Sequence, residues 1–407
     1  MTPLKENRSA RRPGIGRHRR EEPSAASVAD IREALLLATY SYTAGTTHGF
    51  YHYPARFSAA IASTVIERFT SPGDWVLDPF MGGGTSIIEG MARGRRMLGV
   101  DINSLACFVS RVRTTPLSRV QSKSILEWAS QAARVTLDPS LSAPSAVAKN
   151  LPATVAGFLA AALETVHSLQ TPPERAFARC VLLRLGQWAL DCRKRVPRGS
   201  SLRRKVETLA GAMLEGMDDF IAQCRRAGLS KRDLLDNRRL VCRSAVGIES
   251  DTHLDAAAKR PRLVITSPPY PGVHVIYHRW QYRSRRETSA PYWIASQRDG
   301  KFESFYTGGS RTPTGETRYF TMIERAYKSI RHVVHPESYI VQLVGFADSA
   351  RQLPRYLEAM KAAGYSEWTP PGLTARLCRR VPNRKWYASI RGHIDPASEH
   401  LLIHRPT

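Results

Sequence analysis

The segment Ser267-Pro268-Pro269-Tyr270 places a hydroxyl, two rigid prolines and an aromatic ring directly after the apolar run 261–265. The β-branched run predicts a buried parallel strand, which delivers the segment to the carboxyl edge of a sheet, where open α/β sheets bind ligands. Prolines lack N–H groups, so the backbone carbonyls there are free to accept hydrogen bonds. The Ser267 hydroxyl and the Pro268 carbonyl form an acceptor pair suited to an exocyclic amino group, with the Tyr270 ring stacked on the base. The segment therefore predicts a site for a flipped nucleobase.

A second apolar run, 75–77, leads into the sequence DPFMGGGTS at 78–86. Gly82 to Gly84 let the chain turn with positive φ and approach a ligand closely, and residues 85–89 can open a helix. The pattern is strand, glycine turn, helix. A P-loop needs a lysine after the glycines and a dinucleotide fold prefers spaced glycines, and neither is present. A plain glycine-rich turn with no ligand remains the alternative at this point.

The run 96–101 predicts a second strand, and it ends in Asp101. In doubly wound sheets an acid at this place accepts hydrogen bonds from ribose hydroxyls. Nucleoside binding therefore fits these residues better than phosphate binding.

Three segments together resemble a known family: DPFMGGGTS at 78–86, GVDIN at 99–103 and TSPPY at 266–270. The chain resembles the S-adenosylmethionine-dependent DNA methyltransferases that modify exocyclic amino groups, making N4-methylcytosine or N6-methyladenine. The segment HYPARF at 52–57, followed by an expected helix to Phe69, is similar to the family element that closes over the methionine part of the cofactor. The resemblance covers residues 46–105 and 236–405. It implies an α/β fold with a doubly wound, Rossmann-like class I methyltransferase sheet.

The resemblance implies S-adenosyl-L-methionine as the cofactor and assigns roles to individual positions. The positions expected to bind the cofactor are Tyr53, Pro54, Phe57, Asp78, Pro79, Phe80, Gly82, Gly84, Thr85, Ser86, Asp101, Ile102 and Ser244. The positions expected to be catalytic are Ser267, Pro268, Pro269 and Tyr270. No metal site is expected.

Two features of the chain differ from relatives. The strand 239–244 lacks the acidic residue that many relatives place against the cofactor's adenine, so Ser244 or a backbone group serves instead, or adenine is held more weakly. The cofactor turn precedes the base-binding strand, which differs from the permuted order common among cytosine N4 enzymes. Serine before Pro-Pro-Tyr, however, is commonest among those enzymes, whereas aspartate usually marks adenine enzymes. Cytosine N4 is therefore the expected target.

The expected chemistry follows from the nucleophile, whose lone pair is delocalised into the base. Acceptors that hold the N–H groups favour attack on the methylsulfonium carbon, and direct in-line transfer then needs mainly positioning. The cofactor brings its own charged leaving group, so neither a metal nor a covalent intermediate is required. With Ser267 in place of an aspartate, the sequence shows no carboxylate base, and the proton is expected to leave to water. No Pro-Cys segment follows a strand, which argues against methylation at cytosine C5.

The charge of the chain agrees with a polyanionic partner. The 407 residues have a formal net charge of +25 and a pI of about 10.3, which implies salt-sensitive binding to a polyanion such as the DNA that the resemblance implies. Two clusters interleave cations with aromatic rings, as stacking and phosphate contacts require, and ordinary core packing of Trp280 and Tyr282 is the alternative. The expected nucleic-acid contacts are Arg279, Trp280, Tyr282, Arg283, Arg285, Arg286, Arg384, Lys385 and Trp386.

The chain divides by composition into four parts. Residues 1–28 are expected to be a disordered basic arm, 29–113 the cofactor-binding half of the methyltransferase domain and 236–407 its catalytic half. Residues 114–235 predict an inserted α-helical subdomain, with helices at 155–169, 176–192 and 202–224. Two roles of this insertion stay open: target recognition, or a structural or partner-docking bundle. Helices at 320–332 and 353–363 and strands at 338–345 and 400–404 are expected to complete the sheet.

Three functions follow from these observations. The favoured one is a site-specific DNA methyltransferase acting on cytosine N4, or on adenine N6 if the base assignment is wrong. An RNA amino methyltransferase is the second, and a catalytically silent DNA-binding subunit of a defence system is the third; a restriction or defence partner is compatible with the first and third. No secretory signal or apolar span is visible in the sequence, so a cytoplasmic protein associated with the nucleoid through DNA is expected, with no membrane partner.

Overall fold

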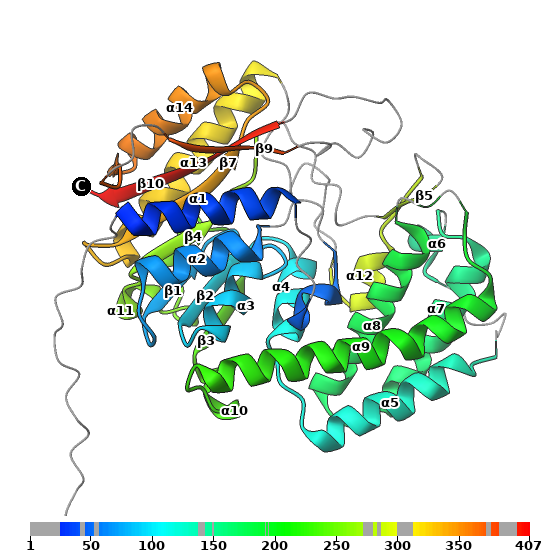
Figure 1. Ribbon diagram of the computed structural model, residues 1–407. Coiled ribbons are helices and arrows are strands. Elements are labelled where there is room, and N and C mark those ends of the chain that lie inside the picture. The colour runs from blue at the N-terminus through cyan, green and yellow to red at the C-terminus, as the bar shows by residue number, and fades with distance from the viewer. Residues whose placement is uncertain are drawn as a thin grey trace, which may run out of the picture.

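The computed structural model describes residues 25–40, 45–52, 57–136, 143–148, 150–191, 193, 195–271, 280–282, 286–298, 312–371, 376–381 and 397–407. Figure 1 shows a lobe built on a β-sheet and, beside it, a lobe of helices. None of the helices within the described ranges is both long enough and apolar enough to span a bilayer.

In the part of the chain that the structure describes, the first lobe is built on an eight-stranded sheet with the order β3-β2-β1-β4-β7-β10-β8, and β9 pairs with β10 outside this path. The strands from β3 to β7 are parallel, whereas β10 runs antiparallel to β7, β8 and β9. The strand order reverses between β1 and β4, which creates the switch point where doubly wound sheets bind ligands. The predicted α/β fold with a doubly wound sheet is thereby confirmed. The strands are β1 (Trp75–Asp78), β2 (Arg96–Asp101), β3 (Arg238–Cys242), β4 (Leu263–Thr266), β7 (Tyr339–Gly345), β8 (Tyr365–Glu367), β9 (Leu377–Val381) and β10 (Ala397–Pro406).

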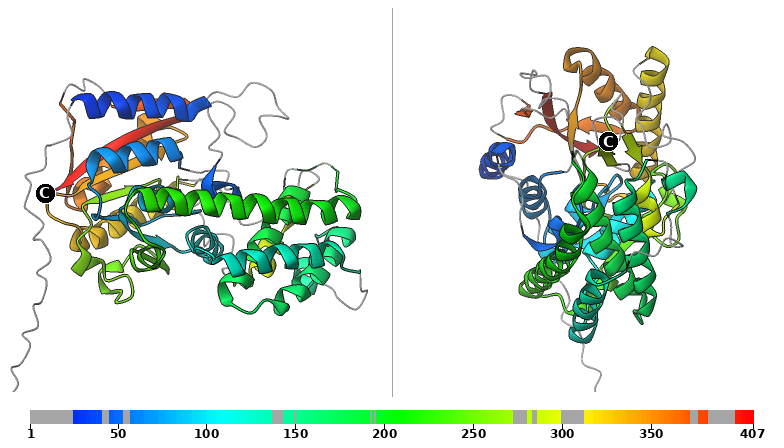
Figure 2. Two further views of the ribbon diagram at one scale, coloured as in Figure 1. Left: turned by 60° about the horizontal axis from the view of Figure 1, so that its bottom comes forward. Right: turned by 90° about the vertical axis from the view of Figure 1, so that its right-hand side faces the viewer.

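Helices cover both faces of the sheet (Figure 2). Side chains of successive strand residues point to opposite faces, so that Val76 belongs to one hydrophobic core and its neighbour Leu77 to the other. The first core contains residues of α1 (Ala25–Tyr40), α2 (Ala59–Phe69), α3 (Thr85–Ala92) and α4 (Ser104–Arg113). The second contains residues of η3 (Ile248–Ser250), α11 (Ala256–Lys259), α13 (Pro313–Val333) and α14 (Ser349–Ala362).

The helical lobe is inserted between α4 and β3. Within the described residues, three of its helices begin with a capping box that satisfies exposed backbone N–H groups. The paired side chains are Ser118 and Gln121, Thr171 and Glu174, and Ser230 and Asp233. The three helices predicted in the insertion are present as α7, α8 and α9, and α9 extends from the helical lobe to the sheet in Figure 1. The elements are α5 (Arg119–Ala133), α6 (Ser145–Ala148), α7 (Ala153–Thr165), η2 (Val166–Ser168), α8 (Pro172–Leu190), α9 (Gly199–Arg226) and α10 (Lys231–Asp236).

Some elements differ from their predicted bounds or were not predicted. Helix α1 begins at Ala25, so the predicted arm of residues 1–28 overlaps the first turn of a helix. Helix α13 begins at Pro313 because the Thr312 side chain accepts from the Gly315 N–H and proline suits the first turn. A hairpin of β5 (Trp280–Tyr282) and β6 (Arg286–Thr288) leads into α12 (Ala290–Ala295), which packs against α8.

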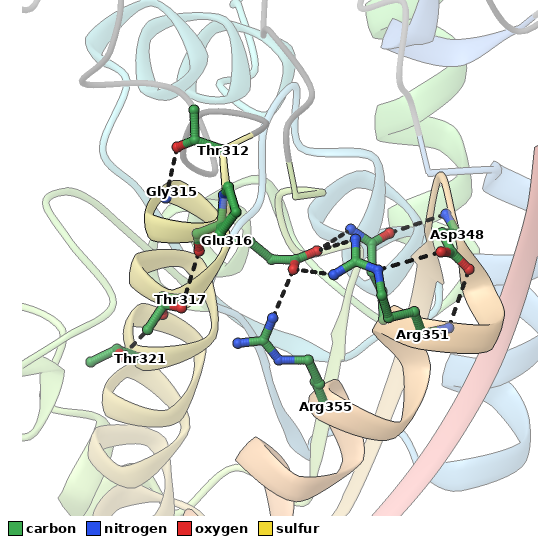
Figure 3. Close-up of polar contacts among 10 residues, drawn as sticks. Thr312, Gly315, Glu316, Thr317, Thr321, Asp348, Arg351 and Arg355 are labelled. Atoms are coloured by element: carbon green, nitrogen blue, oxygen red, sulfur yellow. Dashed lines mark hydrogen bonds and ion pairs between the residues drawn. The ribbon is translucent and has the colours of Figure 1, made fainter.

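A buried carboxylate joins the N-terminal ends of α13 and α14. Glu316 accepts from Gln352 at 2.6 Å, from Arg355 at 2.7 Å and from both terminal nitrogens of Arg351, one of them at 3.0 Å (Figure 3). The hydrogen bond from Arg351 is the largest cause of the lowered pKa of Glu316.

Glu316→Gln is expected to lower the free energy of unfolding by about 1–2 kcal/mol, because charge-assisted hydrogen bonds are lost while the arginines stay partly solvated. Glu324→Gln, which removes an exposed pair with Lys328 on the same helix, is the control and should cost less than about 0.5 kcal/mol. A lowered pKa means that the contribution of Glu316 is present above its unfolded pKa of 4.5 and is lost as the pH falls. Urea unfolding of the wild type and the two variants at pH 7 and pH 4 measures these effects. If the stability difference between wild type and Glu316→Gln grew at the lower pH, the stabilising role of ionised Glu316 would be contradicted.

Candidate active site

Asp78, the last residue of β1, anchors the glycine turn to the neighbouring strand β4. One carboxylate oxygen accepts from the Phe80 N–H at 3.1 Å and from the Thr266 hydroxyl at 2.7 Å, and the other accepts from the Ser86 hydroxyl. Burial, the largest cause, raises the pKa of Asp78 to about 6. Asp78 and Ser86 are buried beneath the turn, so the geometry favours positioning of the turn over direct contact with a ligand.

The glycines of the turn differ in what surrounds them. Gly84 has a φ of +78° and caps α3, and an added Cβ would lie 2.6 Å from the Ser110 hydroxyl. At Gly82, with a φ of +48°, an added Cβ would meet nothing within 4 Å. The turn thus packs tightly on one side and presents backbone to open space on the other, as a cofactor cradle requires.

Asp101 lies at the carboxyl end of β2, next to the turn. Its carboxylate accepts from the Gly82 N–H at 2.9 Å and from the Asn103 N–H at 2.8 Å. Each oxygen retains a second lone pair that can accept from a ribose hydroxyl. Burial raises the pKa of Asp101 to about 6.

The other predicted cofactor residues have varied positions. Pro79 and Thr85 are buried, Phe57, Phe80 and Ile102 are half-buried, and Ser244 is exposed after β3, where its hydroxyl accepts from the Val246 N–H at 3.1 Å. Tyr53 and Pro54 lie outside the described residues.

The predicted catalytic segment follows β4 at the carboxyl edge of the sheet. The Ser267 hydroxyl is 3.1 Å from the Tyr270 hydroxyl, which in turn lies 3.1 Å from Glu399 Oε1 and 3.4 Å from the Leu343 carbonyl. Pro268 is buried and Pro269 is half-buried.

Glu399 and Arg379 were missed by the sequence analysis. Glu399 on β10 is 3% exposed and accepts from Arg379 on β9 through Nε at 2.7 Å and Nη2 at 2.6 Å. Glu399 thus adds to Ser267 a buried carboxylate that acts through Tyr270, and the expectation that the proton leaves to water stays a prediction. An acidic residue directly before the strand expected at 400–404 was the available signal.

A buried cation joins the glycine turn to the segment before α2. Arg113 of α4 is fully buried, and its guanidinium donates to the carbonyls of Gly83, His48 and Tyr51, the His48 contact being 3.0 Å long. The His48 ring also lies 2.7 Å from the Glu89 carboxylate on α3. The short helix η1 (Thr46–Phe50) and Tyr51 are thus fixed beside the turn.

The helical insertion holds the same segment from the other side. Gln187 of α8 accepts from the His52 N–H at 2.9 Å and donates to the His52 carbonyl at 2.7 Å. On α9, a Cβ at Gly216 would lie 2.3 Å from the Thr46 carbonyl, so only glycine permits this approach. The insertion therefore helps to shape the neighbourhood of the cofactor turn.

Trp280 corrects one predicted nucleic-acid contact. Its ring is 1% exposed, its indole N–H donates to the Tyr51 hydroxyl at 3.0 Å, and Gly186 of α8 leaves room for it. The prediction that Trp280 stacks on nucleic acid is wrong for this structure, and the alternative of core packing holds. The sequence neighbours Tyr282 and Arg286 pair across the β5–β6 hairpin. Arg279, Arg283, Arg285, Arg384, Lys385 and Trp386 lie outside the described residues.

Fold and site together define a class of protein, the Rossmann-like class I methyltransferases. The defining features are a doubly wound sheet with a glycine turn, an acid at the carboxyl end of β2 and a Ser-Pro-Pro-Tyr segment at the switch point. Residues 16–110 match the model of a family described as DNA methylase. The chain is therefore similar, over this segment, to the DNA methyltransferases that modify exocyclic amino groups, and the resemblance inferred from the motifs is confirmed.

Individual relatives match over short stretches. The type II methyltransferase M.MvaI of Kocuria varians is 39% identical over 74 residues, which are 17% of this chain and 16% of that protein. The type II methyltransferase M.MjaII of Methanocaldococcus jannaschii is 30% identical over 79 residues, 19% of this chain and 15% of that protein. The matches thus span about one sixth of the length of these relatives.

Solved structures give weaker likenesses. TrmN from Thermus thermophilus has a TM-score of 0.29 at 10% identity and covers 86% of this chain and 49% of its own. The rRNA methyltransferase aviRa from Streptomyces viridochromogenes has a TM-score of 0.28 at 10% identity. The match covers 91% of this chain and 92% of that protein. The fold assignment rests on the observed sheet order.

Proposed function

We propose that this protein is an S-adenosylmethionine-dependent DNA methyltransferase that modifies an exocyclic amino group, with cytosine N4 as the target. The hydrogen bond from Thr266 to Asp78 is the observation that supports this most, because it joins the cofactor turn to the strand that ends in Ser267. Two segments far apart in sequence, each with its own ligand chemistry, thereby meet at one edge of the sheet. The net charge of +25 supports DNA as the partner.

Each part of the edge has a defined task in this proposal. The Gly82 region and Asp101 hold the cofactor, which supplies a methyl group on a positively charged sulfur. Ser267 and the Pro268 carbonyl accept hydrogen bonds from the amino group of the flipped base, and the Tyr270 ring stacks on that base. The rate of methyl transfer is raised mainly by positioning, because the amino nitrogen and the methyl carbon must be held in line with the sulfur.

The proposed function also implies a division of the chain into domains. Residues 29–113 and 236–407 form the two halves of the methyltransferase domain, and 114–235 form the insertion. The contacts of Gln187 and Gly216 with residues 46–52 favour a structural role for the insertion near the cofactor.

Nucleoside mass spectrometry on DNA from a methylation-free host tests the function. Cells expressing the intact protein should contain N4-methylcytosine that is absent with Ser267→Ala. N6-methyladenine instead would keep the reaction and overturn the base. Methylated amino groups in RNA alone would replace DNA by RNA as the substrate, and no new methylated nucleoside in either would contradict the proposal.

Cofactor binding should depend on pH through Asp101. Because burial raises its pKa to about 6, its carboxylate becomes protonated as the pH falls through that value and loses acceptor capacity for ribose hydroxyls. Cofactor affinity is expected to be constant above pH 7 and to fall below pH 6 by up to about tenfold per pH unit.

Asp101→Asn should bind the cofactor about tenfold more weakly at pH 8 and lose this pH dependence. Calorimetric titration of wild type and variant from pH 5 to 8 measures both effects. The difference in pH dependence between wild type and variant separates the effect of Asp101 from that of Asp78. Burial raises the pKa of Asp78 to about 6 as well. Equal pH slopes in the two proteins would rule out Asp101 as the titrating group.

A further inference from the structure

Four side chains form a continuous hydrogen-bonded series at the base-binding edge. Ser267 contacts Tyr270 at 3.1 Å, Tyr270 contacts Glu399 Oε1 at 3.1 Å, and Glu399 Oε2 accepts from Arg379 at 2.6 and 2.7 Å. Only 4% of the Glu399 side chain and 9% of the Arg379 side chain are exposed. A buried ion pair adds little net stability over an apolar pair. Stability alone therefore does not explain why the Glu399–Arg379 pair lies beside the site.

The number of available protons sets the direction of this series. Arg379 only donates, and the ionised carboxylate of Glu399 only accepts. The single proton of Tyr270 goes to the carboxylate at 3.1 Å, which is the stronger and nearer acceptor than the Leu343 carbonyl at 3.4 Å. The Tyr270 oxygen then accepts the proton of Ser267.

Ser267 is left with lone pairs alone to offer a ligand. An exocyclic amino group presents N–H donors, so this orientation suits it, whereas a serine without such partners could point its own proton at the amino group. The buried charge on Glu399 thereby acts on the base through two hydroxyl groups.

We propose that Glu399 is a positioning residue that fixes Ser267 as a hydrogen-bond acceptor toward the amino group of the target base. This inference rests on the proposed function. It concerns only the orientation of hydrogen bonds, and no bond other than those in the methyl transfer is made or broken.

Glu399→Gln tests the inference with little change of shape. The Arg379 donors require an oxygen, so the new amide turns its NH2 group toward Tyr270. Tyr270 then donates to the nearer remaining acceptor, the Ser267 hydroxyl at 3.1 Å rather than the Leu343 carbonyl at 3.4 Å, and the Ser267 proton points at the base. Turnover is expected to fall about 100-fold, with cofactor affinity unchanged. Glu367→Gln, which alters the Glu367–Arg376 pair at 2.7 and 2.8 Å on the same sheet, is the matched control and should keep wild-type turnover.

Tyr270→Phe keeps the aromatic ring but interrupts the series. If Glu399 acts through Tyr270, adding Glu399→Gln to Tyr270→Phe should change turnover less than twofold, in contrast to the large loss that Glu399→Gln causes when Tyr270 is present. A purely structural role of Glu399 predicts the same large loss in both backgrounds, which would overturn the inference.

Urea unfolding separates this inference from the proposed function. It is measured for the wild type, Glu399→Gln, Tyr270→Phe and the double variant. The shift of the midpoint caused by Glu399→Gln should shrink when Tyr270 is phenylalanine, whether or not the protein methylates DNA. Equal shifts in both backgrounds would refute the hydrogen-bonded series itself. If the shifts differ between the two backgrounds but the wild-type protein does not methylate DNA, the hydrogen-bonded series is retained. The proposed substrate, and with it the role of Glu399 toward the base, would then be wrong.

Discussion

Ser267→Ala is expected to reduce methyl transfer by about 100- to 1000-fold while leaving cofactor affinity within twofold of wild type. The serine follows β4 directly, and the anchoring of Thr266 to Asp78 fixes its place beside the cofactor turn. Removing its hydroxyl takes away an acceptor aimed at the amino group without touching the turn or Asp101. The main effect therefore belongs to the transition state and should appear in kcat.

Single-turnover methyl transfer and calorimetric titration of the cofactor measure the two parts of this prediction. Ser250→Ala, an exposed serine in η3, is the matched control and should behave as wild type. Turnover of the Ser267 variant within tenfold of wild type would remove Ser267 from the proposed mechanism. A parallel loss of cofactor binding would show that the substitution disturbs the turn.

Arg113→Met is the second substitution with a large expected effect, in this case on stability. The guanidinium donates to three backbone carbonyls, and methionine fills a similar volume without donors. The free energy of unfolding is expected to fall by about 3–5 kcal/mol, since buried carbonyls lose charge-assisted partners. Cofactor affinity should fall as well, because Gly83 and Tyr51 lose their common anchor.

Arg111→Met on the same helix provides the control. Arg111 is exposed, so the same change of residue should cost less than about 0.5 kcal/mol. Urea unfolding gives the stability of each variant, and cofactor titration at low temperature, where both remain folded, gives the binding. Equal losses in the two variants would contradict the assigned role of Arg113.

The parts of this fold that could be predicted were those with local signals. The apolar run at 75–77 followed by glycines, and the apolar run before the two prolines at 268–269, specify strand and turn without help from distant residues. Helices α7, α8 and α9 were equally accessible, since apolar residues recur along them at helical spacing and prolines separate them.

The missed features depend on partners distant in sequence. Glu399 lies 129 residues beyond Tyr270, and only the register of β10 against β7 brings them together. Trp280 was misread because alternating aromatic and basic residues suit a DNA contact as well as a core, and the space left by Gly186 cannot be seen locally. Arg113 did offer a signal, as a cation one helical turn beyond Val109 on the apolar face of α4.

The position of the insertion also has a consequence for the order in which the protein forms during synthesis. Strand β2 emerges from the ribosome before the insertion, whereas β3, which pairs with it from Met97↔Arg238 to Asp101↔Cys242, emerges after the insertion. Helices joined by short connections form contacts quickly, while parallel strands so distant in sequence pair slowly. We therefore expect the helical lobe to assemble first and to offer α8 and α9 as a finished surface for residues 46–52. Substitutions that weaken the insertion should then lower the yield of folded protein by exposing unpaired strand edges for longer.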